Sequence, residues 1–294
     1  MAAANMKSVK LRIKSIQNTM QITKAMELVA SSKLRKAKER ADRSKPYFRI
    51  LRQTLCNIAL GNYDFTSPYT RENGEDSYCY IVIAGDRGMA GGYNANLFRF
   101  LEEESAGKRF SVLPLGKKSL EYARQKSFPI VTEQYDLVSA LRVSDCYAIA
   151  KLLCERYRQK SFGHIALIYT EFLSMMSQKT GSTSLLPLSD FREDACVICG
   201  REGKEEKIAQ NLILYEPSAE EVFNAIVPEY LSGLLYSAIA SSEASELAAR
   251  RSAMEAATDN AGEMIDKLSL YYNRARQASI TQEITEIVAG AEGQ

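Results

Sequence analysis

Apolar residues recur at helical spacing along the first part of the chain. Residues 7 to about 60 place them at steps of three and four, which predicts one long helix. The positions form two sets, and the shift between the sets predicts a stutter instead of a clean heptad repeat. Pro46 is expected to kink or interrupt the helix in its second half. The two sets are Val9, Ile13, Ile16 and Met20, followed by Ile22, Met26 and Val29.

The end of the chain predicts a second long helix, over residues 218 to 289. Ser218 followed by Glu221 fits a capping box, and Pro228 is expected to kink the helix about two turns in. Small residues are dense in AIASSEASELAAR and AMEAATDNAG, and they would let a second helix approach closely. About 70 helical residues would span roughly 100 Å, so much of this helix must pack outside a compact domain. Apolar spacings of three and four continue through Leu268, Tyr272 and Ala275 and through Ile280, Ile284 and Ile287.

The middle of the chain, from residue 78 to about 215, alternates strand-like and helical segments. Short apolar runs predict strands at YCYIVIAG, RFSVLPLG, HIALIYTEFL, TGSTSLLPL and NLILYEPS. Amphipathic runs predict helices at NANLFRFLEEE, KKSLEYARQK and RVSDCYAIAKLLCERYRQK. This alternation indicates an α/β domain with a mostly parallel sheet, in which HIALIYTEFL and TGSTSLLPL could form a hairpin.

The fold class that follows is α/β with long helices. We expect an antiparallel coiled coil of the N- and C-terminal helices plus a Rossmann-like α/β globular domain. The helices should run antiparallel because the middle domain joins them with its ends close together. The expected divisions are residues 1–60 for the first helix, 75–215 for the globular domain and 216–294 for the last helix.

The two ends carry opposite charge. Residues 1 to 52 hold 14 Lys and Arg against 3 Asp and Glu, a net charge of +11. Residues 216 to 294 hold 5 against 13, a net charge of −8, and the middle stands at −1. Opposite charge favours the pairing, but exposed ion pairs contribute only about 0 to 1 kcal/mol each, so apolar and alanine packing must supply most of the stability.

Two partner classes can be weighed from these patterns. The basic first helix could grip nucleic acid, but aromatic residues do not alternate with the bases there, and its apolar seam needs a partner helix. We therefore expect no nucleic-acid partner. No apolar run approaches the roughly 18 residues needed to cross a bilayer, and the first residues lack the apolar region of a secretory signal.

A glycine cluster, Gly85–Gly92, stands between a predicted strand and a predicted helix, where a phosphate-binding loop would sit. Its spacing is not G-x-G-x-x-G and no G-K-[ST] follows, so a tight turn that needs glycine backbone angles is the preferred interpretation. His164 is the single histidine, which removes most catalytic triads and multi-histidine metal sites. We expect no catalytic residue, cofactor or metal in this chain.

Cys196 and Cys199 form a C-x-x-C in a polar loop. Zinc would need two more ligands, and a thioredoxin-like pair would need a helix N-terminus. A labile disulfide and two unrelated thiols remain, and unrelated reduced thiols are favoured in a chain of cytosolic character.

Three stretches now resemble one family, over the whole chain and in the right order. RIKSIQNTMQITKAMELVASSKLRKAK and ELAARRSAMEAATDNAGEMIDKLSLYYNRARQASITQEITEIVAGA are similar to the N- and C-terminal helices of the gamma subunit of rotary ATP synthases. GDRGMAGGYNAN resembles the family's S-D-R-G-L-C-G-G-x-N turn, with Gly85 in place of serine and Met89-Ala90 in place of Leu-Cys. Gln21 stands where the family often has lysine.

The resemblance implies a non-catalytic rotor shaft. In the family, the paired helices stand inside a ring of three alpha and three beta subunits, and the globular domain sits against the epsilon subunit and the membrane c-ring. Ion flow turns the ring and shaft, and the asymmetric shaft drives each beta subunit through its nucleotide-binding states. The implied location is the cytoplasmic side of a bacterial cell membrane, peripheral and held there through the complex.

The resemblance also implies contacts with the beta subunits. Met26 and Arg250 match positions that face acidic loops of the beta subunits, although Met26 could equally pack in the helix seam. Chloroplast relatives carry a regulatory cysteine insertion near the place of Cys196 and Cys199, so thiol control is a further hypothesis. The positions that match contacts near the C-terminal tip are Arg276, Gln277, Thr281 and Glu283.

Two other functions remain as alternatives. One is an independent α/β nucleotide-binding enzyme with helical arms, which tight binding of ATP or NAD would favour. The other is a basic helical scaffold for nucleic acid, which steeply salt-dependent binding would favour.

Overall fold

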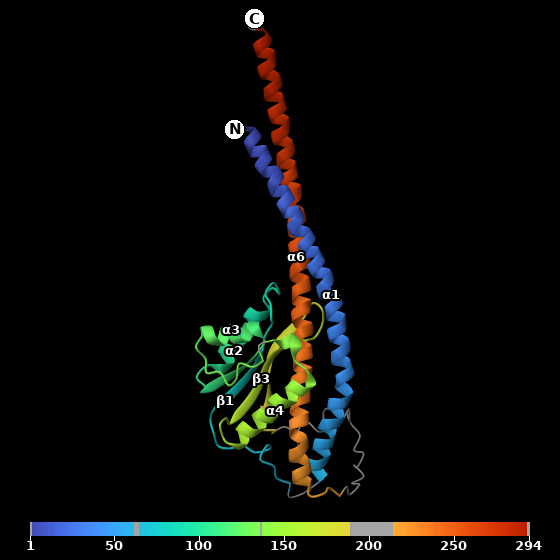
Figure 1. The fold of residues 1–294 in the computed structure, drawn as a ribbon, viewed down its shortest axis with the longest axis vertical. Coiled ribbons are helices and arrows are strands. Elements are labelled where there is room, and N and C mark those ends of the chain that lie inside the picture. Colours follow the sequence, from blue (N-terminus) through green and yellow to red (C-terminus); the bar gives the residue numbers. More distant parts are fainter. Residues whose placement is uncertain (1, 62–64, 136, 189–213, 293–294) are drawn as a thin grey trace, which may run out of the picture. The chain divides into compact units, whose positions relative to one another are not determined.

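The computed structural model describes residues 2–61, 65–135, 137–188 and 214–292 (Figure 1). The chain forms two compact units, each held together by its own internal contacts. The smaller unit comprises Met1–Ser32 and Arg250–Gln294, and the larger unit comprises Lys33–Ala249. Helices α1 (Ala2–Gly61) and α6 (Ala219–Glu292) each contribute to both. Because the units divide both long helices, the three-part division into 1–60, 75–215 and 216–294 stays a prediction.

The larger unit contains a four-stranded sheet in the order β2-β1-β3-β4. β1 pairs in parallel with both β2 and β3, whereas β3 and β4 form an antiparallel hairpin. This is the mostly parallel sheet with a hairpin that the apolar runs predict. The segment predicted as a further strand, NLILYEPS, lies partly outside the described residues, and its described part, 214–218, is not a strand. The strands are β1 (Tyr78–Ile83), β2 (Phe110–Leu115), β3 (His164–Phe172) and β4 (Gln178–Leu186).

Successive side chains of β1 enter two different cores because a strand alternates its faces. Tyr80 and Val82 pack with α2 (Tyr93–Ser105) and α3 (Lys117–Gln125). Cys79, Ile81 and Ile83 face the other core, which contains α4 (Val143–Arg158) and parts of α1 and α6. β1 is therefore buried on both faces, as its continuous apolar run indicates. A single-turn helix, η1 (Val138–Ala140), follows α3 in the chain, and its Val138 joins the core that contains α4.

Within the larger unit, α1 and α6 meet through small and aliphatic side chains. Leu34 and Ala37 of α1 pack on Ala244, Leu247 and Ala248 of α6. In addition, Nη2 of Arg40 lies 3.1 Å from each carboxylate oxygen of Glu243. Apolar and alanine contacts thus form the seam, with the ion pair at its exposed margin.

Serines of α6 bond to the end of β3 instead of to the partner helix. Ser241 Oγ accepts the backbone N–H of Phe172 at 2.9 Å, and Ser245 Oγ donates to the carbonyl of Thr170 at 3.1 Å. Ser242 Oγ accepts the N–H of Thr170 at 3.4 Å. The small residues that suggested a helix–helix seam therefore serve two partners, with alanine facing α1 and serine facing the sheet.

The buried positions of α1 correct the predicted stutter. Buried and half-buried residues follow one another at steps of four and three without a break, so the predicted stutter is wrong. Ile22 and Val29 are 61% and 55% exposed, and Thr23, Glu27 and Ala30 lie in the seam instead. The helix also continues through Pro46 without interruption, while a kink at this residue stays a prediction. The seam of α1 contains Val9, Ile13, Ile16, Met20, Thr23, Glu27, Ala30, Leu34 and Ala37.

The ends of α6 and its composition bear on two further expectations. Ser218 Oγ accepts the N–H of Glu221 at 3.2 Å, which is one half of the expected capping box. By length and composition alone, part of α6 is apolar enough to cross a bilayer, contrary to the sequence estimate. However, 50% of that apolar part of α6 is buried inside the protein.

Candidate functional site

All six residues implied as partner contacts lie in the smaller unit. Met26 comes from α1, and the others come from α6. Met26 and Arg250 are half-buried, whereas the remaining four are exposed. The unit is thus a pair of helices that carries every candidate contact: Met26, Arg250, Arg276, Gln277, Thr281 and Glu283.

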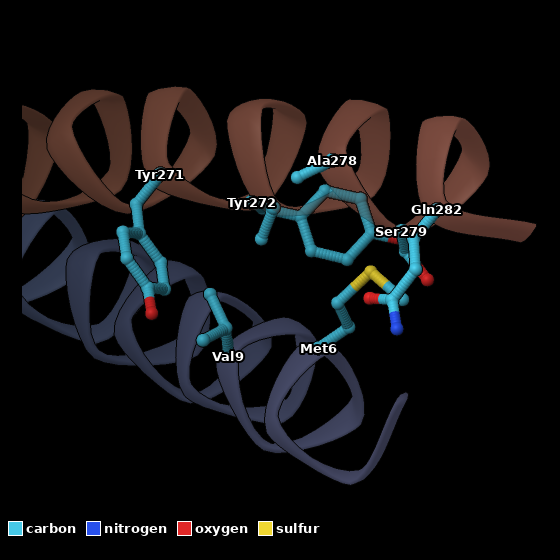
Figure 2. Close-up of a pocket in the computed structure, with 8 residues that line it drawn as sticks. Met6, Val9, Tyr271, Tyr272, Ala278, Ser279 and Gln282 are labelled. Atoms are coloured by element: carbon cyan, nitrogen blue, oxygen red, sulfur yellow. The ribbon is translucent and has the colours of Figure 1, made fainter. Parts of the chain in front are cut away.

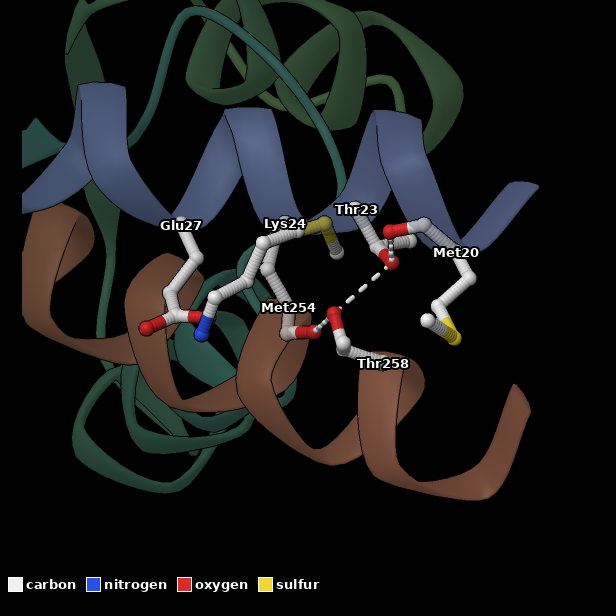
Figure 3. A network of polar contacts seen from close by, with 6 residues as sticks. All are labelled: Met20, Thr23, Lys24, Glu27, Met254 and Thr258. Atoms are coloured by element: carbon white, nitrogen blue, oxygen red, sulfur yellow. Dashed lines mark hydrogen bonds and ion pairs between the residues drawn. The ribbon is translucent and has the colours of Figure 1, made fainter. Parts of the chain in front are cut away.

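The two helix segments of the smaller unit run antiparallel. Thr23 on α1 meets Thr258 on α6, and their hydroxyl oxygens lie 2.8 Å apart (Figure 3). Nearer the chain ends, Val9 on α1 lies with Tyr271 and Tyr272 on α6. Residue numbers therefore fall along α1 as they rise along α6, as the sequence predicts. The sequence pattern gave no sign of the Thr23–Thr258 contact, because threonine is not counted among seam residues.

Met26 lies one turn beyond Thr23, next to the buried carboxylate of Glu27. Lys24 Nζ pairs with Glu27 Oε2 at 3.0 Å, and the exposed fractions of the two side chains are 56% and 10%. Because Met26 is half-buried, its side chain has one part against the seam and one part at the surface. Both interpretations of Met26, seam packing and partner contact, are thus compatible with its position.

The C-terminal candidates form a polar stretch on α6. Thr281 Oγ1 donates to the backbone carbonyl of Gln277 at 2.9 Å, so its hydroxyl proton is used within its own helix. Glu283 Oε1 accepts from Ser279 Oγ at 3.4 Å. Arg276 and Gln277 are exposed neighbours on this stretch. The exposed side chains can offer charge and amide groups to a surrounding protein.

A shallow groove of about 240 Å³ opens between the two helices beside this stretch (Figure 2). Met6 and Val9 form its α1 side, and the tyrosine rings of Tyr271 and Tyr272 form much of its α6 side. Sequence reasoning did not single out this groove, although paired tyrosines on a helix surface are a usable signal for a contact region. Ala275, Ala278, Ser279 and Gln282 complete its lining.

The glycine cluster of the larger unit is built as a structural turn. Met89 and Gly91 have positive φ angles of 62° and 56°. Asp86 accepts the backbone N–H groups of Val138 and Ser139 at 2.8 and 3.0 Å, so its carboxylate caps η1. The turn thereby joins the end of β1 to the neighbouring segment, which is the preferred interpretation from the sequence.

A carboxylate occupies the space above Gly85. A Cβ placed on Gly85 would lie 2.8 Å from the Cδ and Oε1 atoms of Glu246 on α6. The backbone N–H of Gly85 is bonded to Asn94 Oδ1 at 3.0 Å. An anionic phosphate at this turn would meet a negative side chain and would lack this N–H as a donor, so the arrangement disfavours a nucleotide site.

The described cysteines are buried and isolated from solvent. Burial raises the pKa of the thiols of Cys79, Cys146 and Cys154 to about 12, which opposes thiolate formation. Cys196 and Cys199 lie outside the described residues. Within the part of the chain that the structure describes, no group of three His, Cys, Asp or Glu side chains is arranged to hold a metal ion.

Comparisons with known proteins agree with this arrangement. A family model described as ATP synthase matches residues 5–293. The ATP synthase gamma chain of Ruminococcus albus is 44% identical over 291 residues, which covers 97% of this chain and 96% of the relative.

Solved structures show the same fold. A chain from the central stalk and c-ring of the mitochondrial ATP synthase of Tetrahymena thermophila is 25% identical, with a TM-score of 0.58 over 80% of this chain and 99% of that chain. A chain from the mitochondrial ATP synthase of Euglena gracilis, at 19% identity, has a TM-score of 0.67 over 99% of this chain and 95% of that one. Both confirm long paired helices combined with an α/β domain.

Proposed function

Because this chain belongs to the ATP synthase gamma-chain family, we propose that it is the central-stalk rotor subunit of an ATP synthase. It couples ion flow across a membrane to ATP synthesis and hydrolysis in the beta subunits by turning inside the ring of alpha and beta subunits. The observation that carries this proposal is the match over 97% of the chain, which includes both long helices and the sheet.

The paired helices have the properties of a shaft. An uninterrupted seam at steps of three and four supports left-handed coiled-coil packing, which resists bending and unwinding. The candidate contact residues on α6 beyond Arg250 are exposed and polar. A shaft that turns inside a sleeve needs contacts that form and break in water, and exposed polar side chains provide contacts of low net energy.

The coupling contacts follow from the resemblance to the family. Arg250 and Met26 face acidic loops of the beta subunits, where the guanidinium can pair with carboxylates in a bidentate manner. Arg276, Gln277, Thr281 and Glu283 engage the beta subunits near the C-terminal tip. These residues position the catalytic subunits and do not touch the reacting nucleotide, so the chain is a non-catalytic part of the enzyme.

The remaining partners follow from the same assignment. The larger unit contacts the epsilon subunit and the membrane c-ring, and the shaft stands among the alpha and beta subunits. The chain binds no nucleic acid and meets the membrane only through the complex, on the cytoplasmic side of a bacterial cell membrane. In the same division of labour, residues 1–60 and 216–294 serve as the shaft and residues 75–215 as the globular base.

The alternative of an independent nucleotide-binding enzyme is not favoured. The family match covers the helices that such an enzyme would carry only as arms. The carboxylate of Glu246 also stands above the glycine turn, where a phosphate would have to bind.

Met26 offers a direct test in the complete enzyme, reconstituted into vesicles. Met26→Glu places a carboxylate opposite acidic loops, and we expect the number of ions pumped per ATP hydrolysed to fall because like charges repel. Met26→Leu keeps volume and polarity, so it is the matched control and should pump as the parent does. Ion pumping by the Met26→Glu enzyme that equals the parent's would remove Met26 from the coupling contacts, and a complex that assembles and pumps without this chain would refute the rotor function.

A further inference from the structure

Two polar residues interrupt the seam of the smaller unit. Val9, Ile13, Ile16 and Met20 occupy successive seam positions, and Thr23 and then Glu27 follow at the next two. Thr23 is 9% exposed and Glu27 is 7% exposed, so neither side chain is a surface residue. Apolar residues at these positions would add hydrophobic stabilisation. Polar residues there lower the stability of the helix pair, so stability alone does not explain their presence.

The Thr23–Thr258 hydroxyl pair joins the two helices directly. The hydroxyl oxygens lie 2.8 Å apart, and the two side chains point toward one another across the helix interface (Figure 3). Each hydroxyl also lies near a carbonyl of its own helix, at 3.0 Å from Met20 for Thr23 and 2.8 Å from Met254 for Thr258. The two hydroxyls together carry two protons, so they can donate only two of these three hydrogen bonds. The bond between the helices forms when one hydroxyl donates to the other instead of to the carbonyl of its own helix.

The surroundings make this bond sensitive to register. Met254 and Ala261, one turn to either side of Thr258 on α6, are buried at 7% and 6% exposure. A shift of α6 along α1 would place an apolar side chain opposite Thr23 and leave the cross-helix bond unmade. Thr23 is buried and Thr258 is half-buried, so water replaces a lost bond only in part, and the arrangement of the helices that keeps the bond is favoured.

Glu27 is a second polar residue in the seam, one turn beyond Thr23 along α1. Its carboxylate bonds to Lys24 of the same helix at 3.0 Å, so the charge is neutralised without a partner from α6 being required. Met26 lies between the hydroxyl pair and the next turn, directly before Glu27 in the sequence. Thr258 is two turns beyond Arg250 on α6. The hydroxyl pair and Glu27 thus lie within one turn of Met26 along α1, and the hydroxyl pair lies two turns from Arg250 along α6.

We propose that the Thr23–Thr258 hydroxyl pair holds the register and rotational phase of α1 against α6, and thereby positions Met26 and Arg250 for their partner contacts. The two threonines are positioning residues, since they act through Met26 and Arg250. The positioning role rests on the proposed rotor function, whereas the register role concerns the helices alone. A single buried polar contact that selects helix register at some cost in stability is an established device in coiled coils.

The register role is tested by distance distributions between spin labels in the full chain assembled in the complete enzyme. Labels are attached at Lys14→Cys and Lys267→Cys, both exposed sites on the two helices, in a chain with Cys196 and Cys199 replaced by serine. In the Thr23→Val, Thr258→Val double variant we expect the distribution to broaden about twofold, because valine keeps the shape but lacks the hydroxyl. A distribution as narrow as the parent's overturns the proposal.

Two matched variants separate register from stability. Thr19→Val removes an exposed hydroxyl of α1 that donates to the backbone carbonyl of Ser15 in the same helix, and the distribution should stay unchanged. Thr23→Ser with Thr258→Ser keeps both hydroxyls and should restore the narrow distribution. The double valine variant should melt at or above the parent's temperature, since replacing both partners by apolar groups of equal shape is nearly neutral. A lower melting temperature with a narrow distribution would mean an ordinary stabilising contact and would overturn the proposal.

The positioning role is tested by ions pumped per ATP hydrolysed in the same enzymes. In the double valine variant, we expect the number of ions pumped per ATP hydrolysed to fall to about half of the parent's value. The double serine variant should restore the parent's value. A broadened distribution with an unchanged ratio would refute the positioning role. Failure of the rotor function itself would be recognised separately, because a complex without this chain would then assemble and pump ions.

Discussion

Thr23, Gly85 and the buried cysteines show how single residues act through what surrounds them. Thr23 occupies a seam position because a second hydroxyl lies 2.8 Å away. At Gly85, the carboxylate of Glu246 fills the space that a side chain would use. Cys79, a small thiol on β1, is fully enclosed by the core that contains α4. In each case the neighbours, and not the residue type, decide the role.

The buried thiols predict a loss of stability at high pH. Burial raises the pKa of Cys79 from 9.0 to about 12 in the folded chain, while nearby Arg156 acts in the opposite sense. Because the pKa of the thiol is higher in the folded than in the unfolded chain, the thiol's contribution to folding stability is complete at pH values below the pKa of the unfolded chain. That contribution is lost as the pH rises toward the pKa of the folded chain. The free energy of unfolding should therefore fall between about pH 9 and about pH 12, by up to about 1.4 kcal/mol per pH unit for each thiol.

Urea unfolding of the full chain at about pH 8 and about pH 10.5 measures this fall. Cys79→Ala removes one titrating thiol, so the variant should be less stable at both pH values but should lose less between them. An equal loss in the parent and in Cys79→Ala would contradict the assignment. Raised pKa values of Cys146, Cys154, Tyr69 and Tyr122, each about 12, contribute in the same direction.

Small residues of α6 allow this helix to pack closely on α1 and on β3. Alanines at its seam meet α1, while Ser241, Ser242 and Ser245 bond to the end of β3. Two glycines of the same helix occupy opposite situations. A Cβ on Gly233 would lie 1.9 Å from Cδ1 of Phe48 on α1, whereas one on Gly262 would meet nothing within 4 Å. The first glycine is required for close approach of the helices, and the second is not.

Alanine at each glycine should therefore change stability in opposite directions. Gly262→Ala should stabilise the chain by about 0.5 to 1 kcal/mol, because alanine loses less conformational entropy in a helix. Gly233→Ala should destabilise it by about 1 to 3 kcal/mol or more, because the methyl group overlaps the Phe48 ring. Thermal and urea unfolding of the two full-length variants provide the comparison. Stabilisation by Gly233→Ala would show that α1 and α6 do not meet at this point.

At the scale of the whole molecule, the two units contain different features. Among the described residues, the larger unit, Lys33–Ala249, contains the sheet and three buried apolar clusters. The smaller unit contains all six candidate contacts with the beta subunits. Opposite charge on the two ends of the chain supports their pairing, but buried aliphatic and alanine side chains dominate its energy. Damage at the end of α6 should therefore affect coupling before it affects the sheet.

Truncation after Tyr271 tests this division. It removes four of the six candidate contacts and part of the groove, so assembly and ion pumping should weaken strongly. The thermal transition of the larger unit should persist, because none of its residues is removed. Truncation after Thr285 is the matched control, since it keeps every candidate contact and should retain most of the pumping. Loss of the sheet's thermal transition on truncation after Tyr271 would contradict the division.

Local spacing alone determined much of this protein. The apolar runs placed β1, β2, β3 and the β3–β4 hairpin, and the steps of three and four placed α1 and α6, because element type depends on neighbours in sequence. The long specific stretches at the two ends also sufficed to identify the family, which the comparisons confirm. The contact roles of Met26 and Arg250 stay predictions, since they depend on other chains.

Tertiary structure decided which face of each element is used. Spacing by itself favoured Ile22 and Val29 for the seam, yet the partner helix accepts Thr23 and Glu27 in their place. Likewise, the serines of α6 turned to β3, and Glu246 came to stand above Gly85. A periodic pattern allows several faces of nearly equal hydrophobicity. The choice among them depends on hydrogen-bond partners and close contacts from segments 69 to 235 residues away in the sequence.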